Sequence, residues 1–274
     1  MSSNAWVEGS IQANGVDLHY HRTGGDKPPI ILLHGISDNG LCWTPVAKQL
    51  ENDFDVIMVD ARGHGKSVAP ELDFGLELMA DDVAALIKEL DLHAPMLLGH
   101  SMGGQVATIT ASKYPALVSK IMLEDPAYFL KKSLKFLVKL ILPAFLWNSK
   151  RSDKKTVDQI KASCKKAHPT WSDEELDPWA IAQKDFARNI KTIKIKNINL
   201  DVAWYDVFPK ITCPVLLIIP SNGVLRLPAA EKLKPKFAAT KVDIAYIPGA
   251  SHSVRREQFE KYMDAVKSFC SNQE

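Results

Sequence analysis

Residues 95–105 read Pro-Met-Leu-Leu-Gly-His-Ser-Met-Gly-Gly-Gln, and they are the most informative segment of the 274-residue chain. An apolar run ends at Leu98, the pentapeptide Gly99-His-Ser101-Met-Gly103 follows, and a helical pattern continues to Tyr114. A Gly-x-Ser-x-Gly sequence is an ordinary glycine-rich turn unless it joins a strand to a helix. In that context the glycines relieve crowding around a strained serine, whose hydroxyl projects above the sheet. The sequence therefore predicts a nucleophile at Ser101.

Further apolar runs alternate with helical patterns on both sides of this segment. Continuous apolar runs of this length are typical of strands that are buried on both faces, as in a parallel sheet covered by helices. The runs are Ile30–Leu33, Phe54–Val59, Val118–Leu123, Pro214–Ile219 and Lys241–Ile247, and the helical patterns are Leu41–Leu50, Gly75–Leu90 and Arg255–Cys270. Near the N-terminus, Asn14-Gly15 lies between two alternating runs and predicts an antiparallel hairpin. The pattern is that of an α/β protein.

The alternation stops after Pro126 and resumes near Ile211. The intervening helical patterns, which have little strand character, are Tyr128–Trp147, Lys154–Lys166 and Asp177–Ile190. We therefore expect an α/β core from residues 1–126 and 206–274, with a helical insertion from residues 127–205. This insertion contains 16 Lys and Arg against 8 Asp and Glu. We interpret this excess as the solvated face of lysine-rich helices, with contact to nucleic acid or to an anionic membrane as alternatives.

Composition excludes several classes of protein. With 46% hydrophobic and 24% charged residues, the chain is neither collagenous nor disordered, and its four scattered cysteines form no disulfide framework. The longest apolar stretch, Phe136–Trp147, is interrupted by Lys139 and Pro143 and is short of the roughly 20 residues that cross a bilayer. The first residues lack a basic region followed by an apolar one, so we expect a cytoplasmic protein with reduced thiols. We find no metal-binding or dinucleotide-binding motif and expect no cofactor.

Three motifs together resemble the α/β-hydrolase superfamily over nearly the whole chain. They are the serine pentapeptide, Leu33-His-Gly35 after the preceding strand, and Asp60-Ala-Arg-Gly-His-Gly-Lys-Ser67. The resemblance implies a mostly parallel central sheet with antiparallel N-terminal strands, helices on both faces and a helical cap insertion. It also implies that the backbone N–H groups of Ile36 and Met102 form the oxyanion hole, and that His34 shapes the loop.

The same resemblance assigns the base to His252, but the usual position of the acid is not occupied by a carboxylic acid in this sequence. His252 follows the last predicted strand, where the superfamily carries its catalytic histidine. The usual acid follows the strand at Pro214–Ile219, but Gly223 stands there, next to Asn222. Glu124 and Asp125 end the strand before, a site for the acid in some branches of the superfamily. Adjacent side chains at a strand end diverge, so only one can reach the histidine. We predict Asp125, which lies further beyond the strand, with Glu124 as the alternative acid and Asn222 or water as the remaining one.

These residues predict a serine hydrolase that cleaves a carboxylic ester or a lactone through an acyl-enzyme on Ser101. Alternatives that use the same triad are hydrolysis of a C–C bond or of a thioester, and a ligand-binding receptor with low turnover. A serine at position 101 argues against haloalkane dehalogenase and epoxide hydrolase activity, for which the superfamily uses an aspartate there. We expect a small-molecule substrate, no nucleic-acid partner and no stable membrane insertion; the sequence does not indicate the oligomeric state.

Overall fold

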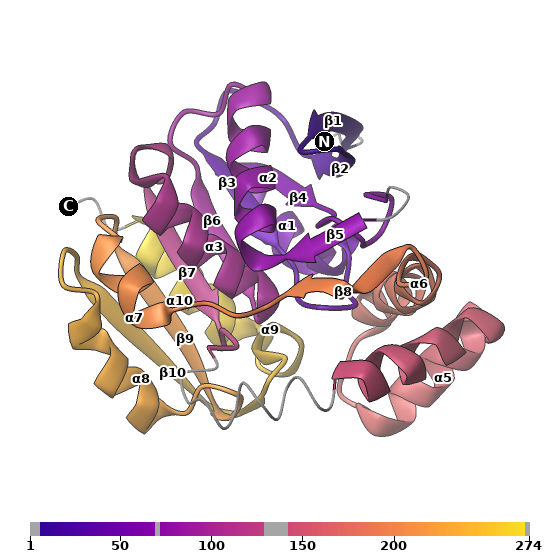
Figure 1. The fold of residues 1–274 in the computed structure, drawn as a ribbon. Coiled ribbons are helices and arrows are strands. Elements are labelled where there is room, and N and C mark those ends of the chain that lie inside the picture. Colours follow the sequence, from indigo (N-terminus) through magenta and orange to yellow (C-terminus); the bar gives the residue numbers. More distant parts are fainter. Residues whose placement is uncertain (1–5, 69–71, 129–141, 272–274) are drawn as a thin grey trace.

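The computed structural model describes residues 6–68, 72–128 and 142–271 (Figure 1). Much of the helix predicted at Tyr128–Trp147 lies outside the described residues, and its last part, residues 142–149, is helical.

An eight-stranded sheet forms the centre of the molecule, in the order β1-β2-β4-β3-β6-β7-β9-β10. All neighbouring strands from β4 to β10 run parallel, whereas β1–β2 and β2–β4 are antiparallel pairs. The fold is therefore the predicted mixed α/β sheet with antiparallel N-terminal strands. The strands are β1 (Val7–Ala13), β2 (Val16–Arg22), β3 (Pro29–Leu33), β4 (Asp55–Val59), β6 (Met96–His100), β7 (Lys120–Glu124), β9 (Val215–Asn222) and β10 (Val242–Ser251).

The hairpin between β1 and β2 turns where the sequence predicts it. Asn14 and Gly15 have φ angles of 46° and 79°, the left-handed conformation that both central residues of a type I′ turn require. Ala13 and Val16 pair across this turn. The Asn-Gly dipeptide thus sets the register of the first two strands.

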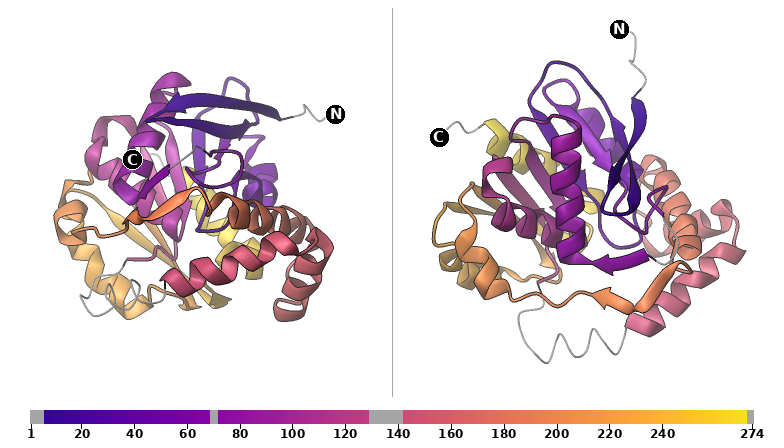
Figure 2. Two further views of the ribbon diagram at one scale, coloured as in Figure 1. Left: turned by 45° about the vertical axis from the view of Figure 1, so that its right-hand side comes forward. Right: turned by 45° about the horizontal axis from the view of Figure 1, so that its top comes forward.

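Helices cover both faces of the sheet (Figures 1 and 2). Side chains alternate between the faces, so Ile31 and Leu33 of β3 pack in one apolar core and Ile30 and Leu32 pack in another. The first core is covered by α2 (Leu76–Glu89), α3 (Met102–Lys113), α7 (Trp204–Val207) and α8 (Leu227–Leu233). The second is covered by α1 (Thr44–Leu50), which follows the 3₁₀ turn η1 (Gly40–Trp43), and by α10 (Phe259–Ser271).

The final helix differs from its prediction. A single helix over Arg255–Cys270 is wrong, because the chain breaks at Gln258, whose φ of −137° is not helical. The result is a short helix, α9 (Val254–Glu257), followed by α10. The break separates the residues next to His252 from the long helix that packs on the sheet.

Between β7 and β9 the chain leaves the sheet and forms the segment predicted as a cap. Its elements beyond residue 149 are η3 (Lys150–Lys154), α5 (Val157–Ala167), α6 (Asp173–Asn189) and β8 (Ile193–Asn199). The sequence analysis missed the strand β8, which lies beyond the last predicted helix of this segment and pairs in parallel with β5 (Leu72–Gly75) in a separate two-stranded sheet. The repeat Ile193-Lys-Ile-Lys has the period of two that a strand shows.

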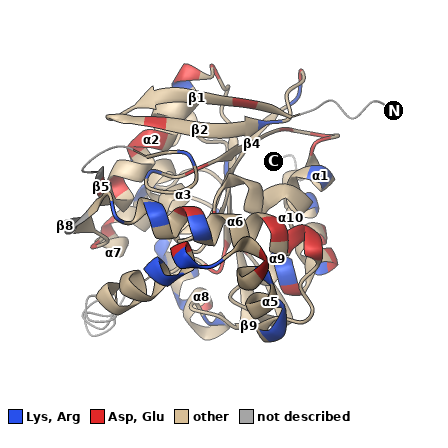
Figure 3. Cartoon of the chain, turned by 90° about the vertical axis from the view of Figure 1, so that its right-hand side faces the viewer, with Lys and Arg blue, Asp and Glu red and all other residues tan. Residues whose placement is uncertain are grey.

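The first turn of α6 is acidic, with Asp173, Glu174 and Glu175, and its last turn carries Arg188, so residues of both signs lie on this helix (Figure 3). Lys48 of α1 pairs with Glu174 at 2.5 Å, and Lys191 pairs with Asp153 at 2.6 Å. These exposed pairs fit a solvated surface. None of the described helices is both long enough and apolar enough to span a membrane, and all four cysteines are free thiols.

Candidate active site

Ser101 occupies the tight turn between β6 and α3. Its φ of 52° and ψ of −110° are strained for a residue with a side chain. A Cβ at Gly99 would lie 2.3 Å from the carbonyl oxygen of Gly103, and a Cβ at Gly103 would lie 2.0 Å from that of Leu33. Both glycines of the pentapeptide are therefore required for the close approach of β3, β6 and α3 around the serine.

His252 lies beside the serine, in the segment that joins β10 to α9. Its Nε2 is 3.0 Å from the Ser101 Oγ, a hydrogen-bonding distance. The backbone carbonyl of His252 accepts a hydrogen bond of 2.9 Å from Nε2 of His100, and the two rings lie 4.7 Å apart. Burial, reinforced by the charge of Arg255, holds the pKa of His100 well below its usual value, so His100 is a neutral donor. Sequence reasoning missed this contact, since no pattern distinguishes His100 from any residue that flanks a serine.

Asp125 lies on the other side of the His252 ring. Its Oδ2 is 2.5 Å from Nδ1 of His252. The carboxylate also accepts hydrogen bonds of 2.8 Å from each of the backbone N–H groups of Val224 and Leu225, and the residue is fully buried. Asp125 has a φ of 38°, a left-handed conformation that turns the chain directly after β7. The structure thus brings together Ser101, His252 and Asp125 from three strand ends.

The Asp125 carboxylate fills the space beside Gly223, the residue at which the superfamily usually carries the acid. A Cβ at Gly223 would lie 2.3 Å from Oδ2 of Asp125, so the glycine leaves the space that the aspartate fills. Asn222, the neutral alternative, is exposed and its nearest side-chain partner is Arg226 at 3.5 Å.

Glu124, the alternative acid, points away from the histidine ring, as expected for the neighbour of Asp125 in a strand. Its two carboxylate oxygens accept hydrogen bonds of 3.0 Å from the backbone N–H and the Nη1 of Arg255. Burial raises the pKa of Glu124 although Arg255 opposes the effect.

The two predicted oxyanion donors lie on segments that meet at the serine. A Cβ added to Gly35 would be 3.5 Å from the Cβ of Ser101, so the loop that carries Ile36 packs directly on the turn at Ser101. Met102 is the first residue of α3, where a backbone N–H has no acceptor within the helix. His34 holds the loop: its Nδ1 donates to the Gly35 carbonyl at 2.8 Å and its Nε2 accepts from the Ala61 N–H at 3.0 Å.

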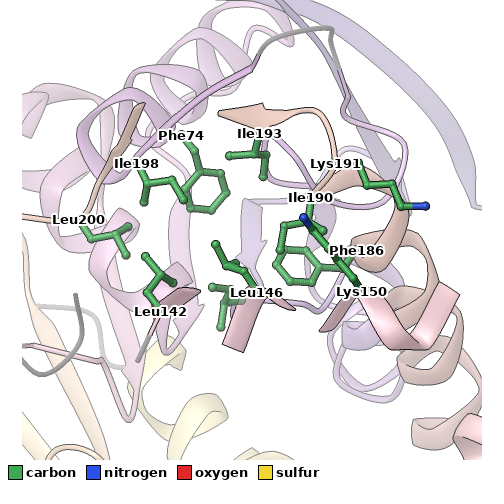
Figure 4. A pocket seen from close by; sticks show the side chains of 11 residues that line it. Phe74, Leu142, Leu146, Lys150, Phe186, Ile190, Lys191, Ile193, Ile198 and Leu200 are labelled. Atoms are coloured by element: carbon green, nitrogen blue, oxygen red, sulfur yellow. The ribbon is translucent and has the colours of Figure 1, made fainter. Parts of the chain in front are cut away.

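An apolar pocket adjoins the oxyanion loop (Figure 4). Its wall combines Ile36 with side chains from β5, the helical residues 142–149, the end of α6 and β8. Two cationic side chains, Lys150 and Lys191, lie at one side of an otherwise apolar lining. The lining consists of Ile36, Phe74, Leu142, Leu146, Lys150, Phe186, Ile190, Lys191, Ile193, Ile198 and Leu200.

A group of side chains with metal-ligand chemistry lies on the β1–β2 hairpin rather than at the triad. Within the described residues, Glu8, His19 and His21 are the group of three whose ligand atoms approach one another closely. Nε2 of His19 is already bonded to Glu8 at 2.9 Å, its Nδ1 is bonded to Asp60 at 2.9 Å, and Lys66 also pairs with Glu8. Glu8 and His19 are thus bonded to each other and to Lys66 and Asp60, and the triad uses none of these residues.

Comparison with known proteins agrees with this fold. The sequence profile described as alpha/beta hydrolase fold matches residues 28–212. The chain is 28% identical to N-formylmaleamate deformylase of Pseudomonas putida over 276 residues, 95% of each protein. It is also 28% identical to 2-(acetamidomethylene)succinate hydrolase of Mesorhizobium japonicum over 284 residues, 98% of this chain and 97% of that protein.

A solved structure supports the same conclusion at the level of the fold. The crystal structure of an E-2-(acetamidomethylene)succinate hydrolase superposes with a TM-score of 0.78 at 21% identity, covering 98% of this chain and all of the other. Since the family profile spans more than half of the residues, this chain belongs to the family of the alpha/beta hydrolase fold.

Proposed function

We propose that this protein hydrolyses a small carboxylic ester or a lactone through an acyl-enzyme on Ser101. The observation that carries the proposal is the continuous series of hydrogen bonds from the Ser101 Oγ to His252 at 3.0 Å and from His252 to Asp125 at 2.5 Å. A serine hydroxyl becomes an effective nucleophile only when a base accepts its proton, and an imidazole held by a carboxylate is such a base.

The proposed mechanism has two halves. In the first, the Ser101 Oγ attacks the acyl carbon while Nε2 of His252 accepts the hydroxyl proton, and the N–H groups of Ile36 and Met102 stabilise the oxyanion. The imidazolium, stabilised by Asp125, then protonates the leaving alcohol. In the second half, His252 deprotonates a water molecule that attacks the acyl-enzyme, and the proton returns to Ser101 as the acid leaves.

The apolar pocket suggests which part of the substrate lies next to the oxyanion loop. Ile36 contributes both to this wall and, in the proposal, to the oxyanion hole, so the pocket adjoins the acyl carbon. Its apolar lining fits a hydrocarbon group, and Lys150 fits an anionic group at the far end of the substrate (Figure 4). Lys191 is already paired with Asp153. We regard residues 127–205 as the cap that covers the hydrocarbon group of the substrate.

A second candidate is the hydrolysis of a small N-acyl compound. It is favoured by the two relatives that match over almost their full length, since one is named a deformylase of N-formylmaleamate and the other a hydrolase of 2-(acetamidomethylene)succinate. The same triad would act, with His252 protonating a leaving nitrogen instead of an oxygen. Both named compounds are also carboxylates, which fits Lys150 at the side of the pocket.

The test is turnover of a substrate panel by the wild-type protein and by Ser101→Ala. The panel contains p-nitrophenyl esters of increasing acyl length, simple lactones and N-formyl or N-acetyl amides that carry a carboxylate. We expect ester or lactone turnover that falls by about 10³-fold or more in Ser101→Ala, at an unchanged melting temperature. A preference for the amides would select the second candidate, and equal turnover by Ser101→Ala would refute both. A fluorophosphonate that labels Ser101 without multiple turnovers on any substrate would indicate a receptor.

A further inference from the structure

Segments from four parts of the chain meet in one buried group of charged side chains behind the proposed triad. We call it the arginine cluster, and it consists of Asp38, Glu124, Glu175, Arg255 and Arg256. None of these residues is more than 7% exposed. The proposed mechanism uses none of them, so their burial needs another explanation.

Glu124 connects the three strand ends that carry the triad. Its backbone carbonyl accepts the N–H of Ser101 at 3.0 Å, and the next residue in the chain is Asp125. Its carboxylate accepts two hydrogen bonds of 3.0 Å from Arg255, one from the backbone N–H and one from Nη1. Since Arg255 is three residues after His252, one side chain fixes the histidine turn relative to the serine and the aspartate.

The cluster continues to the oxyanion loop. Nη2 of Arg255 lies 3.2 Å from Oδ2 of Asp38. The N–H of Asp38 in turn donates to the carbonyl of Gly35 at 3.1 Å, which closes the turn around Ile36. Burial raises the pKa of Asp38, but the charges of Arg256 and Arg255 outweigh it, and the net pKa is lower than usual. Asp38 therefore remains an anion that holds the loop to the histidine segment.

Arg256 extends the cluster to α6. Its Nη2 lies 3.0 Å from Oδ2 of Asp38, and its Nε lies 3.0 Å from Oε2 of Glu175, in the first turns of α6. The two guanidinium groups also lie over indole rings, Arg255 over Trp43 at 4.2 Å and Arg256 over Trp171 at 4.7 Å. These stacked planar groups have few alternative orientations.

Stability alone explains such a cluster poorly. The cost of removing several charges from water offsets most of their mutual attraction, and well-packed apolar side chains often serve stability as well or better. What a buried ionic network provides is a single geometry, because the directions of its hydrogen bonds allow few others.

We infer that Glu124, through the arginine cluster, is a positioning residue that holds His252, the oxyanion loop and α6 in register with Ser101. The inference rests on the proposed function, since it concerns the rate of attack by Ser101. Catalysis is sensitive to such placement, and an error of about 1 Å can lower a rate about 100-fold.

The experiment compares Glu124→Gln with a matched control, Asp82→Asn. Glutamine keeps the shape of Glu124 and an acceptor for the Arg255 N–H but removes the charge. Asp82 forms an equally buried pair with Arg62, at 2.6 and 2.5 Å, between α2 and the loop after β4. Each protein is assayed well below its own melting temperature, for ester turnover and for the rate at which a fluorophosphonate labels Ser101.

We expect both variants to melt at lower temperature and only Glu124→Gln to be slow. Its kcat and its labelling rate should fall together, about 10-fold to 100-fold, with KM within about twofold of wild type. Arg255→Lys, which keeps the charge but cannot reach both Glu124 and Asp38, should fall between, and it carries the test if Glu124→Gln does not fold. Wild-type kcat in folded Glu124→Gln or Arg255→Lys, or an equal loss in Asp82→Asn, would overturn the inference.

Ser101→Ala, measured in parallel, separates this inference from the proposed function. If Ser101→Ala is inactive while Glu124→Gln is fully active, the positioning role of Glu124 is refuted and the proposed function stands. If Ser101→Ala retains turnover, or if the wild-type protein neither labels nor turns over any substrate, the proposed function is refuted and this inference with it.

Discussion

Two neighbouring carboxylic acids, Glu124 and Asp125, have opposite surroundings in this protein. Asp125 accepts three hydrogen bonds, from the imidazole and from two backbone N–H groups, whereas Glu124 is bonded to a guanidinium group and a backbone N–H. The alternation of side chains at the end of β7 separates them. That alternation was visible in the sequence, and so was His252 as the partner of Asp125. The backbone donor Val224 and the Arg255 partner of Glu124 were not, because they are about 100 or more residues away along the chain.

Asp125→Asn tests the proposed acid. The amide keeps the size of the carboxylate but can neither stabilise an imidazolium nor favour the required tautomer, so kcat should fall about 10³-fold to 10⁴-fold. The measurement is steady-state ester hydrolysis, with the melting temperature as a check on folding. The matched variant is Asn222→Ala, which should retain turnover within about twofold because Asn222 is exposed and does not touch the ring. The reverse order of the two losses would assign the acid to the other strand end.

At the scale of elements, the prediction succeeds where a single hydrophobic pattern extends over the whole segment. The apolar runs around Leu33, Val59 and Leu123 are strands because both of their faces are buried, and this burial leaves a continuous apolar signature. The strand β8 was missed because it is short, pairs away from the main sheet and has lysines at alternate positions, so it lacks the continuous apolar run that marks the other parallel strands. The break at Gln258 was missed because the apolar positions with helical spacing, Phe259, Met263, Val266 and Phe269, all lie after it and give no information on where the helix begins.

β8 matters because it forms part of the apolar pocket, and Ile198→Trp tests this role. The larger side chain should shorten the pocket, so kcat/KM for a p-nitrophenyl octanoate should fall about 10-fold or more while that for the acetate stays within about twofold. The control is Ile181→Trp, on the exposed surface of α6 and outside the pocket lining, which should leave the ratio of the two rates unchanged. Equal losses for octanoate and acetate would show that the pocket does not hold the acyl group.

At the scale of the whole molecule, buried histidines set the response to acid. Burial lowers the pKa of His34, that of His64 to about 3, and that of His100 well below its usual value. Each has a pKa near 6.5 in the unfolded chain, so below about pH 6.5 the unfolded state binds protons that the folded state does not. The free energy of unfolding therefore decreases as the pH is lowered. For His64 alone, the decrease is about 2 kcal/mol at about pH 5 relative to neutral pH.

The measurement is thermal unfolding at about pH 7.5 and about pH 5, where we expect a clear drop in melting temperature. His19 acts in the opposite direction: burial lowers its pKa, but Asp60 and Glu8 raise it further, and this stabilisation is lost as the pH rises. His19 therefore offsets part of the destabilisation that His34, His64 and His100 cause at low pH. His64→Asn should reduce the difference between the two conditions, whereas the exposed His93→Asn should leave it unchanged. A melting temperature that rises on acidification would contradict the account.

The sequence predicted most of the architecture and the three residues that the structure brings together, but little of what surrounds them. The Gly-x-Ser-x-Gly turn and His252 are local signals, each fixed by a position next to a strand. The contacts of His100 and of the arginine cluster depend on the order of strands in space, which places β7 between β6 and β9. No local pattern of a single chain contains that information.

The glycine at position 223 has a broader consequence for how hydrolases are compared. Two adjacent strand ends open onto one small volume, and a carboxylate supplied from either end would meet the same nitrogen of the imidazole. The acid can therefore come from a different position in the sequence and still occupy the same position in space. A comparison that looks for the acid only after β9 would find Gly223 there and would pass over Asp125, although the order serine, acid, histidine along the chain is unchanged and the carboxylate lies beside the His252 ring.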